Sequence, residues 1–138
     1  MLVEVTDKPI TLDPAMRALE LTVHGAVVTF LGTVRRYTGE RVVQYLDYEA
    51  YPEMAAEKLR QVADEAKTKY GLEDIVILHR IGRLYVGEAS LAVALGSPHR
   101  REGFDACLYT VERIKEIVPI WKKEVWASGA VWVNAERA

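Results

Sequence analysis

The chain has 138 residues, of which half are apolar and 28% are charged, and its formal net charge is −2. This length and balance predict a single globular domain over residues 1–138 with its own hydrophobic core. The small net charge argues against a general affinity for nucleic acid or for an anionic membrane, so any basic site must be local.

Cysteine content and the N-terminal segment indicate the compartment. Cys107 is the only cysteine, so neither an internal disulfide nor a cysteine-based zinc site is possible. Its apolar neighbours predict a core residue rather than a nucleophile. Residues 1–10 include early acidic residues and lack the apolar core of a signal peptide. No apolar run approaches the roughly 18 residues that span a bilayer. We therefore expect a cytoplasmic protein.

The first third of the chain predicts strands around one short helix. Residues 2–5, "LVEV", are typical of a strand. A helix is predicted to begin with Asp13 as its cap and Pro14 at its first helical position. The β-branched, apolar residues 25–35 predict a second strand. After a polar turn that contains a glycine, residues 42–51 are predicted to form its hairpin partner.

Two long helices and further strands are predicted in the remainder. Apolar residues recur at steps of three and four between Pro52 and Gly71, which predicts a helix. A second long helix is predicted to begin at Ser97 and to end at Pro119. More strands are expected at residues 74–82, 88–97 and 122–133, the last as a strand, turn and strand. Hairpins alternate with single helices, which predicts an α+β fold with a mostly antiparallel sheet packed against helices.

One charged residue lies within the apolar stripe of the helix that follows Ser97. At 100° per residue, an arc of roughly 120° contains Phe104, Cys107, Leu108, Val111, Ile114 and Val118. Lys115 falls inside this arc. It either extends to solvent from the last helical turn, where a cation suits the helix dipole, or lines a pocket. In a pocket, partial burial would lower its pKa and suit it to acid–base or nucleophilic chemistry.

The same helix begins with bases, although a helix N-terminus favours acids. The segment "SPHRREGF" places His99, Arg100 and Arg101 in the first turn. Backbone N–H groups there can hold an anion, so the cluster is typical of a phosphate or carboxylate site. The alternative is that an arginine simply pairs with Glu102 or Asp105.

The remaining candidates have weaker patterns. Lys122 and Lys123 are adjacent in a predicted strand and so point to opposite faces, but their spacing does not say which faces a site. Arg35 comes at the end of a predicted apolar strand, and on its own an arginine there is typical of a solvated strand end. His24 and His79 form no metal-binding pattern with a nearby acid or cysteine, so both are interpreted as structural.

Five segments in order, "GAVVTFLGTVR", "YEAYPEMA", "HRIGRLYVGE", "SPHRREGFDAC" and "VPIWKKE", closely resemble the large, catalytic subunit of molybdopterin synthase. The resemblance extends over about residues 25–132. It implies an α/β hammerhead-type fold and a homodimer. A small ubiquitin-like subunit would dock on each half to give a heterotetramer, and its C-terminal Gly-Gly thiocarboxylate would donate sulfur.

The resemblance also implies a function and a set of site residues. The substrate would be cyclic pyranopterin monophosphate (precursor Z), converted to the dithiolene of molybdopterin by two sulfur transfers, with no metal and no cofactor. The implied catalytic residues are Lys115 and Lys122. The implied anion-binding residues are Arg35, His99 and Arg100. Relatives often place an arginine near the C-terminus that reaches the neighbouring subunit, and here Glu136 aligns with it, with Arg137 one position later. The alternative functions are a non-enzymatic phospholigand-binding module and a module that binds a partner's tail.

Overall fold

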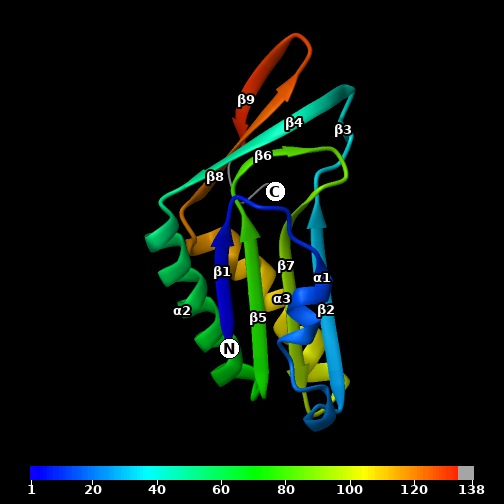
Figure 1. Ribbon diagram of the computed structural model, residues 1–138, viewed down its shortest axis with the longest axis vertical. Helices are drawn as coiled ribbons and strands as arrows, with labels where there is room; N and C mark the ends of the chain where they lie inside the picture. The colour runs from blue at the N-terminus through cyan, green and yellow to red at the C-terminus, as the bar shows by residue number, and fades with distance from the viewer. Residues whose placement is uncertain (134–138) are drawn as a thin grey trace.

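The computed structural model describes residues 1–133, which form two sheets and three α-helices (Figure 1). The first sheet has the strand order β1-β5-β7-β2, with bounds β1 Leu2–Thr6, β2 Ala26–Thr33, β5 Asp74–Arg80 and β7 Ala89–Ser97. The second has the order β3-β4-β8-β9, with β6 also paired to β4; its bounds are β3 Tyr37–Thr38, β4 Arg41–Ala50, β6 Gly82–Tyr85, β8 Ile120–Trp126 and β9 Gly129–Val133. The helices are α1 Leu12–Arg17, α2 Pro52–Tyr70 and α3 Arg100–Ile117, and a 3₁₀ turn covers Leu21–Val23. Of the strand pairs in this part of the chain, β1–β5 is parallel and the others are antiparallel, which confirms the α+β prediction.

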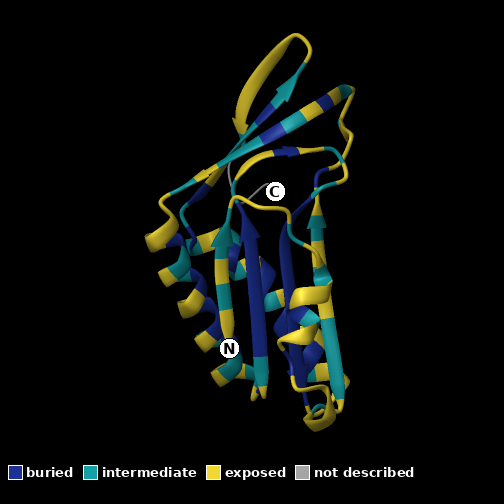
Figure 2. Cartoon of the chain, viewed as in Figure 1, coloured by how far each residue is buried: buried dark blue, intermediate teal, exposed yellow. Residues whose placement is uncertain are grey.

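The first sheet is covered by helices on both faces. Ile75 and Ile77 of β5 pack in one cluster with α2 and α3, whereas Val76 and Leu78 pack with α1 on the opposite face (Figure 1). This follows from the alternation of side chains along a strand. Because both faces are covered, β5 and β7 are buried along almost their whole length (Figure 2). Their continuous apolar sequences are the signature of such strands.

Helix α2 has the bounds that its sequence predicted. Pro52 occupies the start of the helix, and Gly71 ends it in the left-handed conformation with φ of 63°. A proline at a helix start and a glycine just after its end are the favoured arrangement. Its core-facing residues are Ala55, Leu59, Val62, Ala63 and Ala66.

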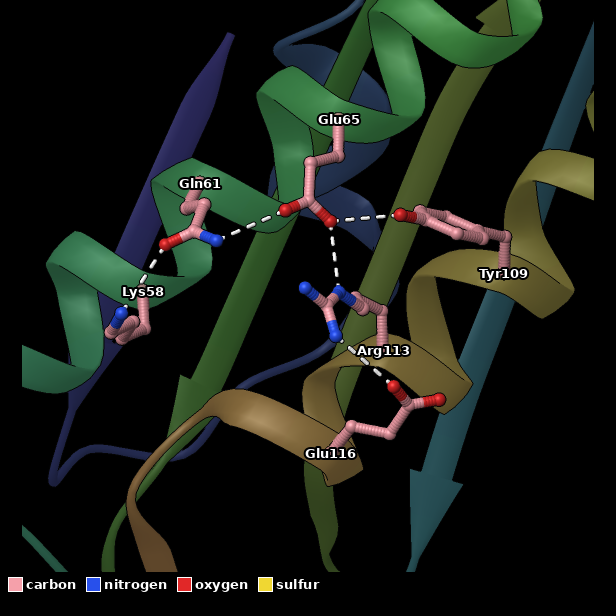
Figure 3. Close-up of polar contacts among 6 residues, drawn as sticks. All are labelled: Lys58, Gln61, Glu65, Tyr109, Arg113 and Glu116. Carbon is pink, nitrogen blue, oxygen red and sulfur yellow. Dashed lines mark hydrogen bonds and ion pairs between the residues drawn. The ribbon is translucent and has the colours of Figure 1, made fainter.

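A polar network joins the outer surfaces of α2 and α3 (Figure 3). Glu65 of α2 accepts hydrogen bonds from Arg113 Nε at 2.9 Å, Gln61 Nε2 at 3.0 Å and the Tyr109 hydroxyl at 2.8 Å. These bonds, the one from Arg113 above all, lower the pKa of Glu65 to about 2. Arg113 also donates to Glu116 at 3.1 Å. The carboxylate of Glu65 therefore ties the two long helices together while it is ionised.

The predicted hairpin between residues 25–35 and 42–51 is wrong. Strand β2 pairs with β7, and β4 pairs with β8 and β6 in the other sheet. The turn was predicted correctly, with Gly39 at φ of 59°, but the strand that it joins to β4 is only the two-residue β3. Backbone hydrogen bonds on the side of β2 that faces β7 continue as far as Val34, whose N–H donates to the Glu88 carbonyl. The chain then crosses between the sheets through Arg35 and Arg36.

The start and the exposed face of α3 also differ from expectation. The helix begins at Arg100 with His99 at its N-cap, and Ser97 instead ends β7, its hydroxyl donating to the His99 carbonyl at 2.7 Å. Similarly, α1 begins at Leu12, one residue before the predicted cap. Phe104 and Leu108 were predicted in the buried stripe, but they are 64% and 61% exposed. The sheet and α2 cover only the side of α3 that carries its small and β-branched residues, which are Gly103, Ala106, Cys107, Thr110, Val111 and Ile114.

Candidate functional site

A cavity of about 650 Å³ lies between the two sheets, beside the C-terminal end of α3. Residues at the end of β2, on β4, β5, β7 and α3, and along β8 and β9 line it. This volume is typical of a pocket for a small-molecule ligand. Segments distant in the chain meet here because β4 and β8 cross the ends of the strands of the first sheet (Figure 1).

Three of the predicted site residues line this one cavity, namely Arg35, Lys115 and Lys122. Arg35 follows β2, Lys115 lies in the last turn of α3, and Lys122 projects from β8. The pKa of Lys122 is lowered, first because burial disfavours its charged form and then because Lys115 and Arg35 are like charges nearby. The cavity therefore combines positive charge with a partly desolvated amine.

Strand alternation separates the two adjacent lysines of β8. Lys122 lines the cavity, whereas the Lys123 ammonium lies on the other face, 5.9 Å from the centroid of the Trp132 ring. Spacing alone could not choose between them, and the structure places Lys122 inward.

A carboxylate that sequence reasoning missed also lines the cavity. Glu124 is buried, accepts a hydrogen bond from the Thr38 hydroxyl at 3.0 Å and lies 3.6 Å from Arg41. Its negative charge raises the pKa of Lys122, opposing the effect of burial. Glu124 is two positions after Lys122 in β8 and so points to the same face of the strand, and this alternation was a signal that could have found it.

Neutral polar side chains complete the lining. Tyr48, His79 and Ser90 come from β4, β5 and β7, respectively. Burial lowers the pKa of His79 to about 4, so its ring is uncharged at neutral pH. Burial likewise raises the pKa of Tyr48, which a hydrogen bond with Ser90 partly offsets. The sequence led us to interpret His79 as structural, and the structure places its side chain in the lining of the cavity.

The other predicted site residues lie elsewhere. His99 and Arg100 are at the opposite end of α3 from Lys115, about 22 Å away at 1.5 Å per residue. Among residues 1–133, neither Arg100 nor Arg101 forms an ion pair with Glu102 or Asp105. Arg137 lies outside the described residues.

The sulfur of Cys107 is remote from this chemistry. The residue is buried in the cluster between the helices and the first sheet, and burial raises the pKa of its thiol. A thiol in that state is a poor nucleophile. Over residues 1–133, no group of three or more His, Cys, Asp or Glu side chains is placed to hold a metal ion. No helix in the same part of the chain is long and apolar enough to cross a membrane.

A cation-lined cavity with a desolvated lysine, set between two crossing sheets, is typical of an enzyme site for an anionic substrate. The chain belongs to the MoaE protein family, whose model matches residues 5–117. It is 45% identical over 132 residues to the molybdopterin synthase catalytic subunit of Bacillus subtilis. The aligned region covers 95% of this chain and 83% of that protein.

Solved structures agree with this assignment. The crystal structure of molybdopterin synthase from Staphylococcus aureus contains a chain that is 43% identical, with a TM-score of 0.89 over 94% of this chain and 95% of that one. A chain from a complex of subunits 1 and 2 of the molybdopterin-converting factor of Helicobacter pylori has a TM-score of 0.77 over 96% of this chain and 90% of that one. At 18% identity, the latter supports the fold alone.

Proposed function

We propose that this chain is the catalytic subunit of a molybdopterin synthase and that its chemistry takes place in the cavity between the two sheets. It transfers sulfur from the thiocarboxylated C-terminus of a small ubiquitin-like subunit to cyclic pyranopterin monophosphate, forming the dithiolene of molybdopterin. The observation that carries the proposal is the meeting of Arg35, Lys115 and Lys122 in one cavity. Family membership and the 45% identical relative support the same activity.

The cations have two tasks in this reaction. Both the substrate phosphate and the partner's thiocarboxylate are anions, and a partly buried cation attracts an anion more strongly than an exposed one does. In each transfer the sulfur bonds to a substrate carbon, an oxygen substituent leaves that carbon, and water releases the partner's tail as a carboxylate. We assign Arg35 to binding the anion, and Lys115 and Lys122 to stabilising the charge that develops and to moving protons.

The lowered pKa of Lys122 suits proton transfer. A lysine at its ordinary pKa is almost entirely charged at neutral pH and cannot accept a proton. Burial and the two neighbouring cations lower the pKa of Lys122 from its ordinary value, and the negative charge of Glu124 opposes this fall. Such a group can both give and take a proton.

His99 and Arg100 complete this site only from a second copy of the chain. Both lie at the far end of α3 from the cavity of their own copy, so their assignment as anion-binding residues requires a homodimer. Phe104 and Leu108 expose apolar surface on the same helix and are suited to such a contact. With one sulfur-carrier subunit on each half, the assembly is a heterotetramer. Arg137 is a further anion-binding candidate.

The decisive experiment supplies all the components. The protein is mixed with the thiocarboxylated partner and cyclic pyranopterin monophosphate, and dithiolene product is measured. The same partner with an ordinary C-terminal carboxylate is the control and is expected to give none. Binding of both components without product would instead support a non-enzymatic phospholigand-binding or tail-binding module. A cytoplasmic location stays a prediction, which fractionation of cells would test.

A further inference from the structure

A neutral, hydrogen-bonding region of the cavity lies next to its cations. Tyr48 of β4 is directly opposite Lys122 in the register with β8, so the two side chains are neighbours on the cavity face. On its other side, Tyr48 meets the ring of His79 edge to face, with 5.7 Å between ring centroids. Lys122, Tyr48 and His79 thus form a row that runs from charged to uncharged groups.

The protonation of His79 determines what it offers to a ligand. Its Nδ1 is 2.9 Å from the carbonyl oxygen of Arg80, which can only accept. In a neutral ring, Nδ1 must therefore carry the proton, and Nε2 is a hydrogen-bond acceptor. Since burial holds the pKa of His79 at about 4, this arrangement persists throughout the neutral range.

Two hydroxyl groups extend the same region. Tyr48 and Ser90 hydrogen-bond to each other, and the Ser90 hydroxyl also lies 3.4 Å from the carbonyl oxygen of Gly32. A hydroxyl can donate one hydrogen bond and accept two, so this pair retains capacity for a ligand. The region presents both donors and acceptors and carries no net charge.

We propose that Tyr48, His79 and Ser90 form a recognition subsite for the uncharged ring edge of the pterin substrate, with the phosphate directed toward the cationic side. This inference rests on the proposed function. A pterin carries amide, amino and ring-nitrogen groups along one planar edge, and a neutral set of donors and acceptors matches that edge. A cation at His79 would compete for the phosphate, so an uncharged imidazole there fixes the orientation of the substrate. Polar groups that are buried and aimed at a ligand give strong discrimination against analogues that lack the matching groups.

The test separates ring recognition from anion binding. Dissociation constants for cyclic pyranopterin monophosphate and for inorganic phosphate are measured on the wild type, Tyr48→Phe and Ser90→Ala. Tyr45→Phe is the matched control, because Tyr45 lies on the same strand but packs against Tyr85 and Arg83. Tyr48→Phe is expected to weaken binding of the pterin about tenfold and to leave phosphate binding within about twofold. Steady-state kinetics are expected to show a larger change in KM than in kcat.

Each outcome has a defined meaning. Wild-type binding of the pterin by both Tyr48→Phe and Ser90→Ala would overturn the inference, as would an equal loss of phosphate binding. If Tyr48→Phe does not fold, Ser90→Ala carries the test with the same criteria. Failure of the proposed function itself looks different, because the wild-type protein then forms no dithiolene product with the thiocarboxylated partner. The inference falls with it in that case.

Discussion

Replacing each of the two adjacent lysines of β8 by alanine tests the site most directly. Lys122 lines the cavity, and Lys123 lies on the opposite face against Trp132. Loss of one preorganised charge that stabilises a transition state typically lowers kcat by about 10²–10³-fold. We expect a loss of this size for Lys122→Ala. Lys123→Ala loses a cation–π contact with Trp132, which contributes about 0.5–1 kcal/mol to stability, and it is expected to leave the reaction almost unchanged because Lys123 does not line the cavity.

The assay is dithiolene formation at saturating partner, with circular dichroism and a thermal melt to confirm that both variants fold. A pH series adds an internal check through Glu124. Since that carboxylate raises the pKa of Lys122, Glu124→Gln lowers this pKa further. The limb of the pH–rate profile that reports Lys122 should therefore move to lower pH, whether the lysine acts as acid or base. A severe loss in Lys123→Ala with a mild one in Lys122→Ala would refute the assignment of the faces.

Two further predictions concern stability and the thiol. The folded state holds Glu65 at a pKa of about 2, below its ordinary 4.5, so its stabilising contribution is present above pH 4.5 and is lost as the pH falls toward 2. Urea unfolding across this range should therefore show a steeper loss for the wild type than for Glu65→Gln, with the exposed Glu57→Gln as control, and equal slopes would contradict the role of the network. Cys107→Ala should retain sulfur transfer and destabilise the fold by about 1 kcal/mol, because the thiol is a small core group. Loss of transfer in a folded Cys107→Ala protein would show that the sulfur does not travel on the partner alone.

Structural features that depend only on residues close together in the chain could be predicted from the sequence. Helix α2 was located because Pro52 and Gly71 impose their own backbone geometry at its two ends. The final hairpin of β8 and β9 was also located, because its turn and strands are contiguous. The partner of β2 was not, because β7 lies about sixty residues further along the chain and competes with the nearby β4. Pairing between distant strands depends on which faces become buried, and local propensity does not contain that information.

The candidate site divides in the same way. Lys115 could be identified as a pocket candidate from one helix, since a charge inside an apolar stripe is a local signal. Tyr48, His79 and Ser90 could not, because each lies on a different strand and the cavity exists only once the two sheets cross. Phe104 and Leu108 were wrongly predicted to be buried. An apolar stripe on a helix shows which residues are apolar, but it does not determine whether other parts of the same chain cover all of them.

The length of α3 turns the proposed homodimer into a quantitative prediction. The helix separates Arg100 from Lys115 by about 22 Å, so a site that uses both must draw them from two copies. Arg100→Ala and Lys115→Ala are each expected to be nearly inactive alone. Unfolding and refolding an equimolar mixture makes half of the dimers mixed, and each mixed dimer contains one intact and one doubly defective site. About a quarter of the wild-type activity should therefore return. A mixture of two separately refolded variants is the control. If the mixture refolded together forms mixed dimers and stays inactive, then Arg100 and Lys115 do not act together across the dimer, and the assignment of Arg100 to this site is wrong.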